Sequence, residues 1–281
     1  MLKGHVRLTE MKISSNKYLF YFYYLYYKLF LFKDVKVGAR MLYYAEFAWL
    51  MSKFSRYFSK LNKDKFLSYC ETRFGKFNIS PDLISNITVS PSFERLDINY
   101  LFNLIEKDVQ LKKTILFVDI GAYFGLYTVA VGNKFKKYKD LKIVTFEPGT
   151  EYISRSTLKL LSKNIQINKL ENVTLYRVGL GSKNSIIPDK SGIKTKKLDS
   201  ILSPSFSKKF NSIYIKLDVD GSEKDVLEGA KMFISRSEKT TLLIEDFVKY
   251  KVIVKYLKEK KFKFIKKLTP YNSFWVTYGK K

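Results

Sequence analysis

Residues 114–128 constrain the fold of this chain more than any other stretch of its sequence. Thr114 to Ile120 is β-branched and apolar, as expected for a strand buried on both faces of a parallel sheet. The run ends around Asp119, and a turn with Gly121 and Gly125 separates it from a new apolar run. Glycines between a buried strand and a helix let the backbone approach a ligand and direct helix N-terminal amides towards it. The stretch therefore predicts a ligand site where the strand ends.

A second strand and a second acid indicate what kind of ligand this is. The next predicted strand, Lys142 to Phe146, ends in Glu147, which lies 22 residues after Gly125. An acidic residue at about that distance accepts hydrogen bonds from a ribose diol. The order of strand, acid, glycine turn, helix, strand and acid predicts a nucleoside-type cofactor in a doubly wound sheet.

The residues of the turn argue against a dinucleotide. The dinucleotide fingerprint needs three closely spaced glycines, whereas Ala122, Tyr123 and Phe124 separate the two glycines here. Tyr123 and Phe124 occupy the space that a pyrophosphate requires, and the charge of Asp119 disfavours a phosphate. A carboxylate at that point suits a cofactor with an ammonium group, such as S-adenosylmethionine.

The downstream sequence continues the alternation of strands and helices. Strands alternating with helices imply right-handed βαβ units, and a terminal hairpin implies an antiparallel edge. We therefore predict an α/β, doubly wound (Rossmann-like) class I methyltransferase sheet with an antiparallel C-terminal hairpin. The predicted elements are a helix at about 151–168, a strand at 173–178, a loop at 179–183, a strand at 213–219, a helix at 222–234, a strand at 241–245, a helix at 248–260 and two strands at 262–268 and 273–278 around the turn Pro270-Tyr271-Asn272.

Five ordered blocks resemble the FkbM family of S-adenosylmethionine-dependent methyltransferases, over roughly residues 90–246. They are Phe117–Thr128, Phe146-Glu-Pro148, Leu198–Leu202, Ile215–Glu223 and Val226–Ala230. Two positions depart from the family pattern. Tyr123 replaces a small polar residue, which affects contacts to the methionine part of the cofactor, and Asp220 replaces a Glu, which keeps the charge. The resemblance implies methylation of a hydroxyl of a sugar, glycan or lipid-linked molecule.

We expect the cofactor to lie beyond the carboxyl ends of the strands. Asp119 orients its amino group directly or through water, Glu147 holds its ribose, and residues 179–181 flank its adenine. A structural alternative is that each of these residues only caps a strand end. The full predicted cofactor set is Asp119, Gly121, Ala122, Tyr123, Phe124, Gly125, Thr128, Glu147, Pro148, Leu180 and Gly181.

Three further strand-end residues are the catalytic candidates. Asp218 is predicted to be the general base, since methyl transfer to a hydroxyl needs a group that removes the proton. Lys216 projects to the same face of the strand and keeps Asp218 ionised or binds substrate. Glu245 arrives at the same edge. Glu223 opens the next helix, where it serves as a cap or in catalysis. The sequence is compatible with a divalent metal that bridges Asp218 and a substrate diol, but does not require one.

Composition narrows the remaining functions. One cysteine (Cys70) and one histidine (His5) exclude an internal disulfide and argue against histidine-based catalysis or a thiolate metal site. The net charge of +26 is spread along the chain and is densest over residues 248–281, with eleven Lys and one Glu. A basic face attracts anionic membranes or RNA, or is simply a solvated lysine-rich surface. An RNA methyltransferase and a non-catalytic membrane-associated scaffold therefore remain alternatives, and the acceptor and oligomeric state are open.

The N-terminal region differs from the rest of the chain. Tyr18 to Phe32 is almost entirely aromatic or leucine, but is shorter than the roughly 20 apolar residues that span a bilayer. Apolar residues recur on one helical face here and again near residues 50–61, which predicts two amphipathic helices. These either pack on the catalytic domain or contact a membrane. We expect a helical segment at 1–70, a catalytic domain at 71–281, and a cytoplasmic protein that can be peripheral at the membrane.

Overall fold

The computed structural model describes residues 12–14, 68–79, 94–149, 157–186, 194–246 and 250–279. The chain divides into two compact units, residues 1–93 with 153–155, and residues 94–152 with 156–281. The two predicted N-terminal helices lie outside the described residues. So does the whole of 80–93, and a catalytic domain that begins at residue 71 stays a prediction.

In the first unit, the described residues form a three-stranded antiparallel sheet. Its strands are β1 (Lys12–Ser14), β2 (Ser68–Thr72) and β3 (Gly75–Ile79), in the order β1-β2-β3. The Thr72 hydroxyl accepts a hydrogen bond from the amide of Phe74 and donates one to the carbonyl of Gly75, which closes the tight turn between β2 and β3.

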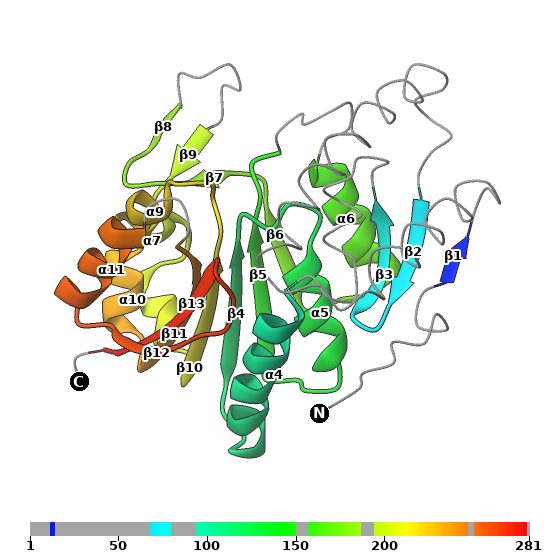
Figure 1. Cartoon of the computed structure of the whole chain (residues 1–281), viewed down its shortest axis with the longest axis horizontal. Helices are drawn as coiled ribbons and strands as arrows, with labels where there is room; N and C mark the ends of the chain where they lie inside the picture. Colours follow the sequence, from blue (N-terminus) through cyan, green and yellow to red (C-terminus); the bar gives the residue numbers. More distant parts are fainter. Residues whose placement is uncertain are drawn as a thin grey trace. The chain divides into compact units, whose positions relative to one another are not determined.

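The second unit contains a seven-stranded sheet with the order β12-β13-β11-β10-β4-β5-β6 (Figure 1). Every neighbouring pair is parallel except the two that include β13, so β13 alone runs against the other strands. This confirms the predicted class I methyltransferase sheet with its antiparallel C-terminal hairpin. The strands are β4 (Ile115–Ile120), β5 (Leu141–Phe146), β6 (Val173–Tyr176), β10 (Ser212–Leu217), β11 (Lys239–Glu245), β12 (Lys263–Lys267) and β13 (Asn272–Tyr278).

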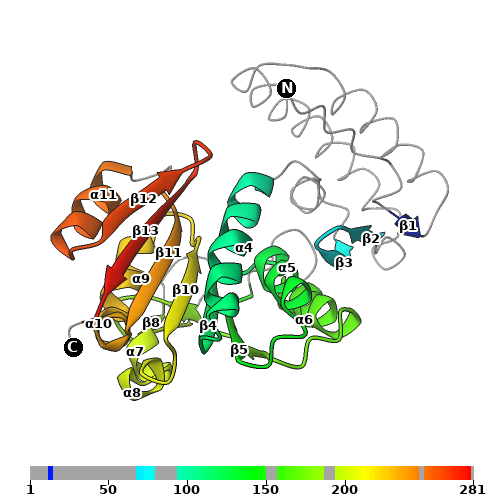
Figure 2. The ribbon, with the colours of Figure 1, turned by 90° about the horizontal axis from the view of Figure 1, so that it is seen from below.

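Helices cover both faces of this sheet (Figures 1 and 2). On one side, strand residues such as Val118, Ile215 and Leu242 form a continuous core with apolar residues of the later helices. These helices are α7 (Leu198–Ile201), α8 (Pro204–Ser207), α9 (Glu223–Gly229), α10 (Lys231–Arg236) and α11 (Tyr250–Glu259). The other group consists of α4 (Arg95–Gln110), α5 (Leu126–Lys134) and α6 (Thr157–Ile167). The central strands are buried throughout, because neither face meets water.

Three features differ from the sequence prediction. Helix α4 lies before the first predicted strand, where no helix was predicted from the sequence. The helix predicted at 222–234 is two helices, α9 and α10, which meet at Ala230. The expected loop at 179–183 begins as a strand, β7 (Gly179–Leu180), in a small sheet with β8 (Ser185–Ile186) and β9 (Lys194–Lys196).

Helix α4 is fastened to the sheet by a buried polar contact. The Tyr214 hydroxyl on β10 donates to Asp108 on α4, and Lys113 and Lys239 form ion pairs with the same carboxylate at 2.9 and 3.3 Å. Burial favours the neutral acid, but the hydrogen bonds from Tyr214 and Lys113 outweigh it and hold the pKa of Asp108 at about 2. The carboxylate is therefore ionised in the folded protein.

The Tyr214→Phe substitution tests this attachment. Loss of the hydroxyl leaves a buried carboxylate with one fewer donor, so the free energy of unfolding should fall by roughly 1–3 kcal/mol. Urea unfolding measures the change. Tyr278→Phe is the matched control, because Tyr278 is 61% exposed, and it should stay within about 0.5 kcal/mol of the wild type. Equal stability of the two variants would contradict the assigned role of Tyr214.

Candidate functional site

The glycines of the turn after β4 are needed by the fold itself. Gly121 and Gly125 have φ values of 78° and 94°, and Tyr123 between them has 54°. A Cβ on Gly121 would lie 1.7 Å from the carbonyl oxygen of Asp218, and one on Gly125 would lie 2.6 Å from a methyl of Leu161. From the sequence, these glycines were expected to allow close approach of a ligand. The structure shows that each is also required by a left-handed backbone and by close packing.

Asp119 lies beneath this turn and is almost fully buried. The amide and hydroxyl of Thr128 donate to its Oδ2 at 2.9 and 2.6 Å, and the Thr128 hydroxyl also pairs with that of Thr145. Burial raises the pKa of Asp119 to about 6, against the hydrogen bonds of Thr128 and the charge of Lys216. Strand pairing places Lys216 beside Asp119, so the two predicted site residues are neighbours.

Glu147 ties three parts of the site together. Its carboxylate accepts hydrogen bonds from the amides of Tyr123 and Gly149 at 2.9 and 3.0 Å and from the hydroxyl of Thr157 at 3.0 Å. Burial raises the pKa of Glu147, while these hydrogen bonds oppose the rise. Since an ionised carboxylate has about four acceptor positions, these three bonds leave about one for a ligand. Glu147 is thus an anchor of the turn as well as a candidate cofactor contact.

Lys216, Asp218 and Glu245 come together as predicted. The Lys216 ammonium is buried and lies 2.9 Å from Asp218 Oδ2, whereas the Asp218 side chain is 33% exposed. Burial opposes the charge of Lys216, but Asp218, Glu94 and Glu245 more than compensate, so its pKa lies above the ordinary value. Burial and the charge of Asp218 raise the pKa of Glu245 to about 8. Both effects favour the protonated form of Glu245, which can donate a hydrogen bond to Asp218.

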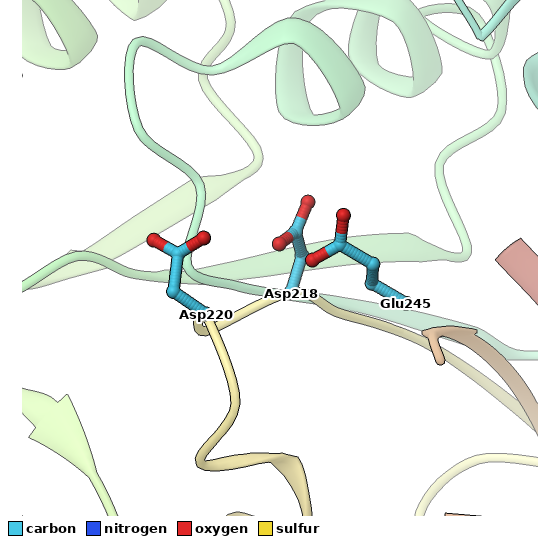
Figure 3. A group of neighbouring side chains, drawn as sticks. All are labelled: Asp218, Asp220 and Glu245. Carbon is cyan, nitrogen blue, oxygen red and sulfur yellow. The ribbon is translucent and has the colours of Figure 1, made fainter. Parts of the chain in front are cut away.

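Asp220 completes a group of three carboxylates that the sequence did not anticipate. One oxygen from each of Asp218, Asp220 and Glu245 lies within 4.8 Å of the others, and Figure 3 shows all three side chains pointing to the same side of the chain. Asp220 has a left-handed backbone with φ of 53°. Its spacing from Asp218 was the available signal, since alternate residues leaving a strand end emerge on one side.

The first turn of α4 contributes two more acids that sequence reasoning missed. The Asn272 side-chain amide donates to Glu94 Oε1 at 3.3 Å and to Asp97 Oδ2 at 3.1 Å, and the Thr269 hydroxyl donates to the same Asp97 oxygen. Glu94 and Asp97 also interact electrostatically with Lys216. The sequence offered only an apolar helical period over Ile98, Leu101 and Ile105 as a signal, and this identifies a helix without indicating a site.

Other predicted residues have roles in packing. The Glu223 carboxylate accepts hydrogen bonds from the amides of Val219 and Gly221, and so holds the turn that precedes α9. Leu180 lies in the apolar core, and the Gly181 carbonyl packs so closely on α9 that a Cβ on Gly229 would lie 2.0 Å from it. Contacts of Leu180, Gly181, Ala122, Phe124 and Pro148 with the cofactor stay predictions.

The donor set of the site fits S-adenosylmethionine. Carboxylates converge at the strand ends from β4, β5, β10 and β11, and the buried lysine among them is paired with Asp218. Hydrogen-bond acceptors and negative charge suit a sulfonium, an ammonium and a ribose diol, and they oppose a pyrophosphate. The structure is therefore consistent with the cofactor that the turn sequence predicts.

The raised pKa of Glu245 should be measurable as pH-dependent stability. Between the ordinary carboxyl value of 4.5 and about 8, the folded protein keeps a proton that the unfolded chain has lost. The free energy of unfolding should therefore fall as pH rises through this window. Thermal unfolding in a chelating buffer from about pH 5 to about pH 9 should show a steeper fall for the wild type than for Glu245→Gln.

The control for this experiment is Glu259→Gln, an exposed glutamate at the end of α11. Its unfolding temperatures should follow those of the wild type across the whole range. Parallel curves for the wild type and Glu245→Gln would show that Glu245 titrates as an ordinary carboxyl group.

Two solved methyltransferase structures are distantly similar to this chain. A crystal structure of an S-adenosylmethionine-dependent methyltransferase from Aquifex aeolicus shares 12% identity, with 68% of this chain and 97% of that chain covered and a TM-score of 0.41. A putative O-methyltransferase from Klebsiella pneumoniae shares 12% identity, with 66% and 80% covered and a TM-score of 0.40. Similarity at this level carries no argument about substrate. No curated protein matches the chain.

The family comparison is decisive. Residues 119–264, slightly more than half of the chain, match the family described as "Methyltransferase FkbM domain". This range includes four acids that lie at or next to the carboxyl ends of β11, β10, β4 and β5, which are consecutive strands of the sheet. These acids are Asp119, Glu147, Asp218 and Glu245. The chain belongs to the FkbM methyltransferases, enzymes that depend on S-adenosylmethionine.

Proposed function

We propose that this methyltransferase acts on a hydroxyl group of a sugar, a glycan or a lipid-linked molecule. The observation that carries the proposal is the Lys216–Asp218 pair at the end of β10. It presents a partly exposed carboxylate that a buried ammonium holds in place, beside Glu245. A carboxylate in this setting can accept the proton of a hydroxyl group.

The residues around the turn would hold the cofactor. Asp119, Glu147 and residues 121–125 form its predicted site, with Asp119 towards the ammonium group and the remaining acceptor position of Glu147 towards a ribose hydroxyl. When bound, S-adenosylmethionine supplies an electrophilic methyl group on a sulfonium. The chain's own contribution is to fix the acceptor oxygen in line with that methyl and to exclude water.

Asp218 removes the proton of the acceptor. Although burial opposes it, the charge of Lys216 and hydrogen bonds from Glu245 and Lys216 hold the pKa of Asp218 below the ordinary value. Asp218 is thus a weak base, but a strong one is not needed. Because the O–H of an acceptor becomes strongly acidic as its oxygen is methylated, a weakly basic carboxylate at this position would be sufficient to take the proton.

The charge of the site supports a neutral acceptor over RNA. Asp218, Asp220 and Glu245 crowd one side of the strand ends, and Glu94 lies near Lys216. Phosphates beside an RNA hydroxyl would be repelled by the ionised members of this group, whereas a sugar without phosphate would not. The net charge of +26 comes from basic residues outside this group of acids.

A lysine-rich surface supports an acceptor at an anionic membrane. Exposed lysines lie along α11 and β12, where Val252 and Phe264 are also 49% and 55% exposed. Such a surface can attract anionic lipids. None of the helices in the described ranges has the length and apolarity to span a bilayer. The exposed lysines on these two elements are Lys251, Lys255, Lys258, Lys263 and Lys266.

Glu147→Ala tests the cofactor site. The substitution removes a candidate ribose contact and frees the amides of Tyr123 and Gly149, so affinity for S-adenosylmethionine should fall by roughly tenfold to a hundredfold. Isothermal titration calorimetry measures this change. Glu171→Ala, at an exposed glutamate, should bind like the wild type. Unchanged affinity in Glu147→Ala, or tight NAD binding by the wild type, would contradict the assignment.

Asp218→Asn separates chemistry from cofactor binding. The variant lacks the base but keeps the shape of the side chain, so the rate of methyl transfer should fall by roughly 10²–10⁴-fold while cofactor affinity is retained. Transfer is followed as a mass increase of one methyl group on glycan, lipid or RNA fractions from cells. Asp225→Asn, at an exposed position of α9, should keep full activity. A fully active Asp218→Asn would remove Asp218 from the mechanism.

A further inference from the structure

Three buried side chains next to Lys216 have polar atoms without a partner. They are Oδ1 of Asp97, the hydroxyl of Tyr127 and Oδ1 of Asn272, and their residues are 0%, 5% and 1% exposed. In the part of the chain that the structure describes, only one other buried side-chain atom, Oγ of Ser212, lacks a partner. We call Asp97, Tyr127 and Asn272 the polar floor.

Asp97 and Asn272 are held rigidly while these oxygens stay unpartnered. The Asn272 amide nitrogen donates to Glu94 and Asp97, and Thr269 fixes both residues by donating to Asp97 Oδ2 and accepting from the Asn272 backbone amide. Each side chain thus uses one polar atom to fix its orientation and leaves the other unpaired. Rigid side chains with spare acceptors are preorganised for a ligand.

The polar floor adjoins the proposed base. The Lys216 ammonium lies 5.2 Å from the centre of the Tyr127 ring and 2.9 Å from Asp218 Oδ2. Asn272 is the direct strand partner of Glu245, so both side chains lie on one face of the sheet. Glu94, Asp218 and Glu245 are partly exposed. The buried floor therefore lies next to a partly exposed rim of acids.

Unpaired buried polar atoms cost stability, and folded proteins contain few of them. Three in one place are best explained if a ligand or water completes their hydrogen bonds, because a half-satisfied polar network is unfavourable in a low-dielectric interior. Their position beside Asp218 makes the methyl acceptor the relevant ligand.

The chemistry of the polar floor selects a hydroxyl group over an ammonium. Asp97 Oδ1 and Asn272 Oδ1 need a donor, and the Tyr127 hydroxyl can donate or accept. Both a hydroxyl and an ammonium can donate to these oxygens, so the nearby charge decides between them. The charge of Lys216 beside Tyr127 disfavours a second cation, and a neutral hydroxyl is therefore the better match.

We propose that the polar floor binds a second hydroxyl of the acceptor, adjacent to the one that is methylated, so that the enzyme acts on vicinal diols of sugar rings. This inference rests on the proposed function, since it concerns the acceptor of the same reaction. Lys216, between the two subsites, holds Asp218 against the first hydroxyl, while Asp97, Tyr127 and Asn272 bind the second.

A chemical treatment of the acceptor tests the diol requirement. A cellular glycan extract is divided in two, and one half is oxidised with periodate, which cleaves vicinal diols, and then reduced with borohydride. Both halves are incubated with the full-length protein and methyl-labelled S-adenosylmethionine. Label should enter the untreated half and be largely lost from the treated half. Equal labelling of both would overturn the diol requirement but leave the proposed function intact, and labelling of neither would overturn both.

Tyr127→Phe and Tyr138→Phe form a matched pair that tests the polar floor itself. The Tyr127 hydroxyl makes no hydrogen bond of normal length and has only a longer interaction with Glu94, so its removal should not lower the melting temperature. The Tyr138 hydroxyl donates to the Lys113 carbonyl at 2.7 Å, so its removal should lower the melting temperature. On the untreated glycan, Tyr127→Phe should raise the KM for the acceptor roughly tenfold, as for loss of one buried hydrogen bond, without changing the KM for S-adenosylmethionine. Tyr138→Phe should change neither KM.

Two outcomes would overturn the role of the polar floor. A Tyr127→Phe protein with an unchanged KM for the acceptor would show that the unpaired hydroxyl is only a packing defect or contacts water. A lower melting temperature for Tyr127→Phe would show that the hydroxyl has a structural partner.

Discussion

The buried ammonium of Lys216 is the interaction on which the site depends. A lysine that is 2% exposed in the centre of a sheet is unfavourable unless carboxylates compensate for its lost hydration. Asp218 does so directly, and Glu94 and Glu245 do so at longer range. These acids come from the ends of β10 and β11 and from the start of α4. One buried charge thus links the central strands to the helix that covers them.

Local charge balance also explains how one small region holds so many acids. Lys216 lowers the pKa of Asp218, while burial and the charge of Asp218 raise the pKa of Glu245. Asp97 is buried, which raises its pKa. The site is therefore much closer to neutral than its count of carboxyl groups suggests. A neutral polar acceptor suits this balance, although the chain as a whole carries a charge of +26.

Particular elements show how much of the structure could be predicted. The strands around Asp119, Glu147, Asp218 and Glu245 were predictable because buried parallel strands are long apolar runs that end in polar residues. Helix α4 was missed because its apolar period lies in a stretch with turn residues before it. The break between α9 and α10 was missed because Ala230, where the helices meet, is a good helix former. The strand β7 is too short to give a periodic signal.

The sequence by itself determined the order of the elements, the cofactor turn and the acids at four strand ends. These features are local, because each follows from residue types within a few positions of one another. Only the tertiary structure decided that Glu147 binds the Tyr123 amide and that Gly121 packs on the Asp218 carbonyl. It also decided that Glu94 and Asp97 contact Asn272, which lies more than 170 residues further along the chain. Such contacts depend on how the helices pack across the sheet, and no spacing in the sequence records that packing.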